Sequence, residues 1–233
     1  MKKLHTFLFI IFLLTIPVLL FSQINIPMKL GLKISPNLGW MSPGTKGYSS
    51  DGARLGMTVG FVSDIYFAEN YALSTGFNFQ FLNGKLNYSD SVAIDGNHKP
   101  VDGQVFRKYN FIYLEIPIMI KMQTKKFGKI SYFGQIGLGT GFRVKTTVKE
   151  HFEPATGNAV DQQYDFNGGT TLIRESILVG IGCEYHIDES TCVFIGFNYS
   201  NSLNNVLTGV NYKSKFNEKS MLNYAELNIG ILF

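Results

Sequence analysis

The sequence feature that most constrains the fold is the alternation of residue types between residues 110 and 122. Every second residue in its centre is Ile or Leu, and the residues between them include Tyr113, Glu115 and Lys121. Because side chains of a β-strand point alternately to opposite faces, one face of this strand is aliphatic and the other carries charge. A strand packed on a soluble core and a strand facing lipid share this pattern, so the rest of the chain must distinguish them.

The same alternation recurs in seven other segments, and turn-forming sequences separate them. The expected strands are 29–40, 55–65, 71–81, 110–122, 130–144, 174–187, 193–200 and 224–233. Long polar loops are expected over 41–52, 83–106, 150–169 and 202–219, with short turns at 68–70, 125–129 and 188–190. Long and short connections that alternate between an even number of strands are typical of membrane barrels. We therefore expect an all-β fold, an eight-stranded antiparallel up-and-down transmembrane β-barrel.

The N-terminus has the pattern of a secretory signal peptide. Lys2 and Lys3 precede an apolar run from Phe7 to Phe21, and Ser22 follows it. A run of roughly 15 residues fits the apolar part of a signal peptide, whereas a spanning helix needs about 20. We expect a signal peptide over residues 1–22 and an outer-membrane barrel domain over 23–233, with an uncleaved anchor helix as the alternative.

Composition excludes several classes of protein. No apolar run after residue 22 approaches about 18 residues, so no membrane-spanning helix is expected. Loss of Lys2 and Lys3 from the 21 basic residues leaves 19 against 17 acidic ones, too small a surplus to indicate nucleic-acid binding. Cys183 and Cys192 are expected on opposite faces of adjacent strands, so we predict no disulfide.

Several short motifs carry a resemblance to a known family. They are Tyr113-Leu114-Glu115-Ile116-Pro117 with Lys121 behind it, Gly31-Leu32-Lys33, the Gly-rich segment 134–141 and the terminal Phe233. With these features the chain resembles the small outer-membrane β-barrel proteins of Bacteroidota known as the PorT-like family. The resemblance implies an integral barrel in the cell outer membrane, in contact with outer-membrane lipid, more firmly than it implies any activity. Phe233 resembles the C-terminal aromatic recognised by the barrel-assembly machinery, which we expect as a partner during insertion.

On the barrel interpretation, one set of charged residues points into the lumen. These residues are Lys33, Arg54, Asp64, Glu115, Lys121, Arg143, Arg174, Glu184 and Glu226. An eight-stranded barrel is just wide enough for side chains to fill, and buried charges are costly unless paired. We therefore expect Glu115 and Glu226 to meet some of Arg54, Arg143 and Arg174, which predicts a plugged lumen. A narrow porin-like pore is the alternative, because many inward Gly residues would leave space.

The predicted loops contain candidate acid–base residues, namely His98, His151, Asp95, Asp161 and Glu153. The sequence has no Gly-x-Ser-x-Gly, no His-x-x-x-His and no cluster with metal-ligand spacing. We predict no enzymatic activity, no cofactor and no metal site. A structural or interaction role through the loops is expected instead, with an unidentified partner. Candidate contacts are Tyr88, Phe106, Phe152, Tyr164, Phe166 and Tyr212, which could equally fold the loops back onto the rim of the barrel. A soluble secreted barrel that binds a small apolar ligand is the alternative architecture.

Overall fold

The computed structural model describes residues 27–93 and 100–233, and the predicted signal peptide over residues 1–22 lies outside the described residues. Ten strands form one antiparallel sheet, and one short 3-10 helix, η1 (Asn167–Gly169), accompanies them. The strands are β1 (Met28–Pro43), β2 (Tyr48–Ser50), β3 (Arg54–Ala68), β4 (Tyr71–Ala93), β5 (Pro100–Gln123), β6 (Ile130–Pro154), β7 (Val160–Asp165), β8 (Ile173–His186), β9 (Cys192–Ser202) and β10 (Ser220–Leu232). Within these ranges no helix is long and apolar enough to cross a membrane.

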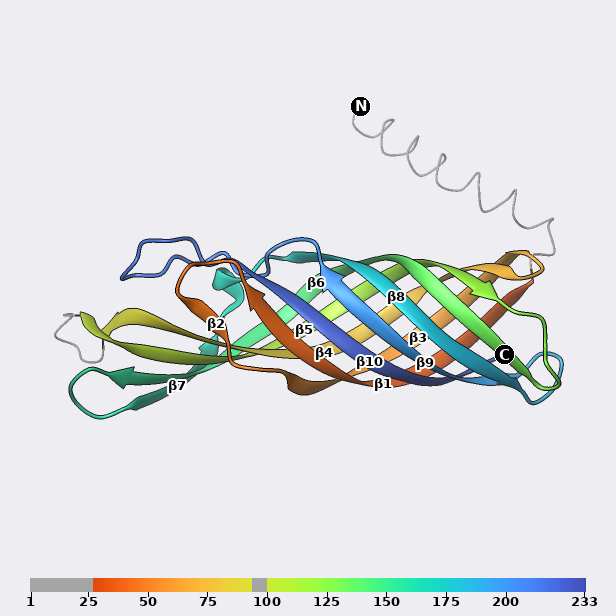
Figure 1. Cartoon of the computed structure of the whole chain (residues 1–233), viewed down its shortest axis with the longest axis horizontal. Coiled ribbons are helices and arrows are strands. Elements are labelled where there is room, and N and C mark those ends of the chain that lie inside the picture. The colour runs from red at the N-terminus through yellow and green to blue at the C-terminus, as the bar shows by residue number, and fades with distance from the viewer. Residues whose placement is uncertain (1–26, 94–99) are drawn as a thin grey trace, which may run out of the picture.

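Eight of the strands close into a ring (Figure 1). Each of β1, β3, β4, β5, β6, β8, β9 and β10 pairs with the next in that order. β10 then pairs with β1 from Leu232 opposite Gly31 to Ser220 opposite Pro43. The predicted eight-stranded antiparallel up-and-down barrel is confirmed. β2 and β7 lie outside the ring and pair with β4 and β6 beyond its loop end.

Strands β4, β5 and β6 extend much further at the loop end of the barrel than the sequence predicts. β4 continues to Ala93, β5 begins at Pro100 and β6 continues to Pro154, so most of the predicted loop 83–106 is strand. The predicted loop 150–169 contains the end of β6 and all of β7. The alternation does not stop in these segments but changes face. On β4 the exposed large apolar residues end at Phe81, and the buried large apolar residues begin at Leu82.

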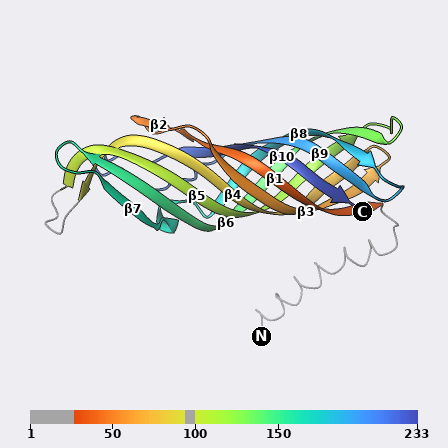
Figure 2. The same cartoon turned by 90° about the horizontal axis from the view of Figure 1, so that it is seen from below.

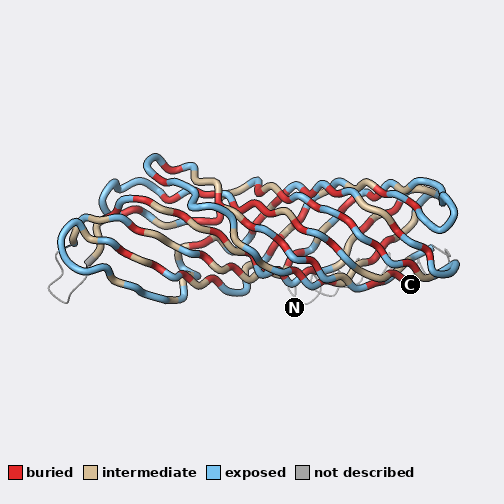
Figure 3. Tube along the Cα trace, turned by 60° about the horizontal axis from the view of Figure 1, so that its bottom comes forward, coloured by how far each residue is buried: buried red, intermediate tan, exposed pale blue. Residues whose placement is uncertain are grey.

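Below that change of face, the outer wall is a continuous apolar belt. Its large side chains are about half exposed, for example Ile118 at 58% and Leu138 at 55%. Soluble proteins rarely expose apolar patches beyond a few hundred Å², whereas this belt covers every strand of the ring. On β5 it runs from Ile112 to Met122, about 25 Å along the barrel axis for the usual strand rise and tilt, which matches the height of a lipid-facing band. Buried and exposed residues alternate along the strands of the ring (Figure 3). The outward positions are therefore the lipid face, and the inward positions are mainly polar.

Aromatic side chains lie at both edges of the belt. Tyr71, Tyr132 and Tyr185 are exposed on the outer wall beside the short turns. At the loop edge the rings of Trp40 and Tyr199 stack with centroids 6.0 Å apart. These positions fit the two aromatic girdles of membrane barrels.

The two cysteines lie as the strand pattern predicts. Cys183 pairs with Ile195 across β8 and β9, and Cys192 pairs with His186. Both thiols are free. Cys192 is buried on the lumen side, next to Glu184.

Candidate functional site

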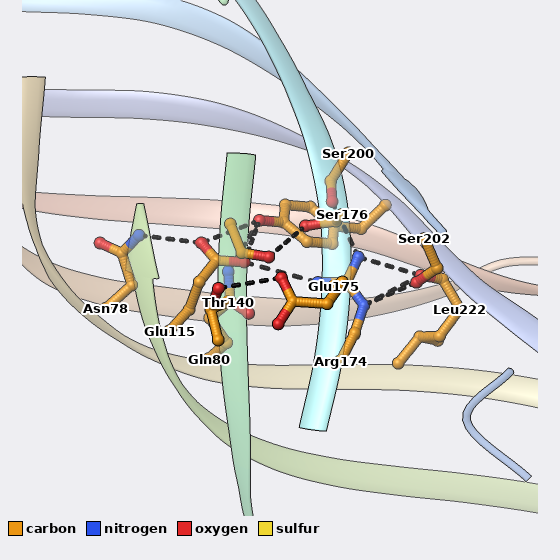
Figure 4. Close-up of polar contacts among 12 residues, drawn as sticks. Asn78, Gln80, Glu115, Thr140, Arg174, Glu175, Ser176, Ser200, Ser202 and Leu222 are labelled. Atoms are coloured by element: carbon orange, nitrogen blue, oxygen red, sulfur yellow. Dashed lines mark hydrogen bonds and ion pairs between the residues drawn. The ribbon is translucent and has the colours of Figure 1, made fainter. Parts of the chain in front are cut away.

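The candidate site is the row of charged side chains in the lumen, at the height of the apolar belt. Its upper group centres on Arg174 of β8, which is 0% exposed (Figure 4). Arg174 Nη1 donates to Glu115 Oε2 of β5 at 3.4 Å. The same guanidinium donates to Ser200 Oγ at 2.8 Å and to Ser202 Oγ at 2.9 Å. The cation therefore has acceptors on three sides in a site closed to bulk water.

Glu115 is held as tightly as its partner. It is 1% exposed and accepts hydrogen bonds from Asn78 Nδ2 at 3.2 Å and from the Tyr224 hydroxyl at 3.3 Å. The Arg174 guanidinium also lies over the Tyr224 ring, 5.2 Å from its centroid. Side chains from five strands, β4, β5, β8, β9 and β10, thus meet at one ion pair and fix the barrel cross-section at this level.

Two further ion-pair groups lie nearer the turn end. Lys33 Nζ contacts Glu226 Oε1 at 3.0 Å and Asn228 Oδ1 at 2.9 Å. Lys121 Nζ lies between Asp64, at 2.6 Å, and Glu184. In all three groups each ammonium or guanidinium faces carboxylates, which is the arrangement that makes buried charge tolerable.

Arg54 and Arg143 are placed differently, which corrects the expectation that they pair with lumen carboxylates. Arg54 donates to the Tyr109 carbonyl at 3.2 Å and to Asn110 Oδ1 at 3.0 Å. Arg143 donates to the Asn167 and Thr170 carbonyls. Neither makes an ion pair within the part of the chain that the structure describes. Residue parity predicts the face of a strand but not the height along it, and both arginines lie at the loop rim.

Little free space remains among these side chains. The lumen cavity that they line measures about 50 Å³, enough for only a few waters. The inward glycines do not leave the interior open, because neighbouring side chains cross it there. A Cβ added at Gly139 would lie 3.1 Å from Glu115, and one at Gly180 would lie 1.9 Å from Asn198 Oδ1.

One group at the turn end has the residue types of a metal site. Donor atoms of Glu184, His186 and Cys192 lie within 4.8 Å of one another. Lys29 Nζ, however, lies 3.7 Å from Cys192 Sγ and 4.0 Å from Glu184 Oε2, and Lys121 contacts the other carboxylate oxygen. Ammonium groups already neutralise the carboxylate that a metal ion would need. The cluster is the end of the lumen charge row, and we do not assign it a metal.

Above the belt the wall encloses a mainly apolar core. Buried members are Met41, Tyr48, Leu82, Leu86, Tyr88, Val105, Tyr109, Phe111, Tyr113, Val148, Phe152, Val206, Leu207, Leu222 and Tyr224. Tyr164 and Phe166 pack against it. Of the two alternatives for the loop aromatics, the structure shows Tyr88 and Phe152 folded back into this core and Tyr164 and Phe166 packed against it, so they hold the loop end of the barrel together. Tyr212 is exposed, and Phe106 is partly exposed.

Sequence reasoning missed a fourth buried ion-pair group, which lies at the loop end of the barrel. Arg107 of β5 contacts Glu150 of β6 and Glu218 Oε1, the latter at 3.4 Å. Its guanidinium lies between the rings of Tyr88 and Phe166, 5.4 and 5.3 Å from their centroids. The inward-facing alternation of β5 contained the signal, but the segment was assigned to a loop.

The candidate acid–base residues that the structure describes lie on the outer face of β6 and β7. His151 Nδ1 lies 2.8 Å from Asp161 Oδ1, and His151 Nε2 lies 3.3 Å from Glu153 Oε1. Both ring nitrogens therefore have a carboxylate partner. His98 and Asp95 lie outside the described residues. Phe233 is exposed at the end of β10, where its N–H donates to the Leu30 carbonyl at 2.7 Å, and its role in assembly stays a prediction.

His151 gives a pH-dependent prediction. The hydrogen bond to Asp161 raises the pKa of His151, since the carboxylate favours the imidazolium. A pKa raised in the folded state stabilises the β6–β7 pairing at low pH, and this contribution is lost as pH rises through the folded pKa. We expect faster amide exchange in β7 above that pKa, and NMR titration should show a lower His151 pKa in Asp161→Asn. Equal pKa values in the two proteins would contradict the assignment.

The sequence matches the family model described as "Outer membrane protein beta-barrel domain" over residues 21–229. No curated protein matches. Neisserial surface protein A is a similar solved structure, with a TM-score of 0.49, 9% identity and coverage of 88% of this chain and 95% of that chain. Outer membrane protein OprG from Pseudomonas aeruginosa has a TM-score of 0.40, 10% identity and coverage of 88% and 94%. Outer membrane protease OmpT from Escherichia coli has a TM-score of 0.39, 8% identity and coverage of 88% and 96%.

Proposed function

The chain belongs to the family of outer membrane protein β-barrel domains. We propose that it is a closed, non-enzymatic barrel that acts through its extracellular part, the end of the barrel that carries the long strands and loops. Its place in the outer membrane follows from the family, and the apolar belt supplies the matching lipid face. The barrel wall anchors the protein, and the taller strands β4, β5 and β6 carry the extracellular part above it (Figure 1).

The proposal of a closed lumen rests on the row of ion-paired side chains that crosses it. Arg174 and Glu115 span the lumen centre, and ion pairs lie below them at Lys33 and Lys121. A solute would have to separate these pairs, and each separation would leave a buried charge without a partner. The narrow porin-like pore is the less supported alternative, since the cavity among these residues holds only a few waters.

The extracellular part supports an interaction role better than catalysis. Its interior is filled by an apolar core and by the Arg107 ion pairs, which make it a rigid support for exposed residues. Binding residues are commonly displayed on loops held by such a support. Insertion by the barrel-assembly machinery, an unidentified loop partner and membership of the PorT-like group of Bacteroidota stay predictions.

Conductance tests the closed lumen. We expect the purified protein in planar bilayers to give no stable current steps in concentrated KCl, with a general porin as positive control. The double variant Glu115→Ser/Arg174→Ser removes both long side chains of the upper ion-pair group; because the groups at Lys33 and Lys121 still fill the lumen below, it should also give no stable steps. Its folding is checked by heat-dependent gel mobility. Stable steps from the unaltered protein would overturn the closed lumen and favour the pore.

A further inference from the structure

Three lysines form a row across the outer face of the extracellular wall. Lys85 of β4 lies directly opposite Lys108 of β5, and Lys108 lies directly opposite Lys149 of β6. All three are on the outward faces of their strands, because the residues on either side of each in sequence are buried or point inward. Like charges directly opposite each other destabilise a sheet. Their own contacts within the sheet therefore do not account for this row.

No carboxylate neutralises the row. Among the described residues none of the three lysines takes part in an ion pair. The acidic residues on the neighbouring outward positions of β7 are engaged elsewhere, Asp161 with His151 and Asp165 with Lys145. His151, on the same face of β6 as Lys149, contacts Asp161 and Glu153 through its two ring nitrogens.

The row borders a groove with polar and aromatic walls. The groove measures about 330 Å³, and it is lined by Phe106, Lys108, Lys149, Glu150, His151, Asp161, Gln162 and Gln163. Of its two carboxylates, Glu150 pairs with Arg107 and Asp161 contacts His151. The Phe106 and His151 rings lie together, with centroids 6.1 Å apart. On the membrane side of the row, Asn83, Asn110 and Thr147 lie opposite one another in the same three strands. Ammonium groups beside amides, a hydroxyl and an aromatic ring suit an anionic sugar better than a bare ion.

The height of the row places it at the membrane surface. Lys85 follows Phe81, the last exposed apolar residue of β4, by four positions. This separation is about 13 Å along the strand and about 10 Å along the barrel axis. A headgroup layer is about 5–7 Å thick on each side of the hydrocarbon core, so lysine side chains in this row reach its outer part.

The direction in which the three lysine side chains point indicates which class of ligand they bind. β4, β5 and β6 continue without a break from the belt into the extracellular wall (Figure 2), and the lysines share the face of Phe81 and Ile112. They therefore point sideways over the lipid and not upward into the medium. We propose that the lysine row binds the phosphate groups on the sugar headgroup of an outer-leaflet glycolipid. The inference rests on the membrane placement of the barrel and is independent of a closed lumen, which conductance tests separately.

Lipid binding by variants tests the proposal. The triple variant Lys85→Gln/Lys108→Gln/Lys149→Gln is compared with Lys46→Gln/Lys215→Gln/Lys219→Gln, which removes three exposed lysines of the loops. The probe is lipid A with both sugar phosphates, in mixed micelles, with binding followed by native mass spectrometry. A lysine near an anionic membrane surface contributes about fivefold in affinity, so the row variant should bind about 100-fold more weakly. The loop variant should bind as the unaltered protein does.

Three further probes identify the ligand. Lipid A without its phosphates should bind equally weakly to all three proteins, and phosphatidylglycerol should bind less well than lipid A to the unaltered protein. Heparin in solution is the third probe. Loss of heparin binding in the row variant with unchanged lipid A binding would overturn the lipid assignment. Equal losses of lipid A binding in the row and loop variants would overturn the site, and heat-dependent gel mobility checks that each variant is folded.

Discussion

Ile118→Arg is expected to lower the free energy of unfolding by about 2–4 kcal/mol, because the new guanidinium would face hydrocarbon near the bilayer midplane. Ile118 points outward from the middle of the belt segment of β5, between Ile116 and Ile120, which are also exposed. No polar partner is available in lipid, so the cation pays its desolvation without a compensating contact. Urea unfolding of the protein in lipid vesicles, followed by Tyr and Trp fluorescence, measures the change.

Gln104→Arg is the matched control for this prediction. Gln104 lies on the same strand and the same face, but it is above the belt and opposite Glu153 of β6. An arginine there meets water and a carboxylate, so the expected change is within about 0.5 kcal/mol. Equal destabilisation by the two substitutions would mean that both positions meet the same solvent, and the belt would then not be the lipid face.

The barrel could be predicted from the sequence because the outer face of each strand in the belt meets lipid along its whole length. The alternation of apolar and polar residues is therefore uniform in these segments. Each belt strand places large apolar residues on the lipid side, and the short turns fix neighbouring registers, as at Cys192 opposite His186. A period of two is strong over ten residues, so the strand order, the lipid face and the inward face of Glu115 can all be predicted.

The extracellular wall could not be predicted in the same way, because the solvent changes along the strand. At Phe81 and Leu82 the apolar residues move from the outward to the inward positions of β4. A search for one continuous apolar face ends there and assigns the rest to a loop. Arg107 and the lysine row were lost for this reason. The partners of the charged side chains could not be predicted either. Odd or even position along a strand gives the face on which Arg54 and Arg143 lie, but not their height along the barrel axis.

The change of face also explains why buried charge lies where it does. Within the belt the outside is apolar, so the only place for polar side chains is the lumen, and Arg174 and Glu115 meet there. Above the belt the outside is water, and an ordinary apolar core such as Leu82 and Leu86 becomes favourable inside. The same strand thus carries its apolar residues on the outward face within the belt and on the inward face above it.

Arg174→Met is expected to lower the free energy of unfolding by about 3–5 kcal/mol, because it leaves the Glu115 carboxylate buried without its cation. The double variant Glu115→Gln/Arg174→Met has a neutral amide at that position. It should therefore be more stable than the sum of the two single changes predicts, by about 1–3 kcal/mol. Urea unfolding in vesicles measures all four proteins of the cycle, and Lys46→Met, at an exposed lysine, should change stability by less than about 0.5 kcal/mol. Strictly additive effects of Glu115→Gln and Arg174→Met would show that the two side chains do not stabilise the barrel as a pair, and the closed lumen would lose its central support.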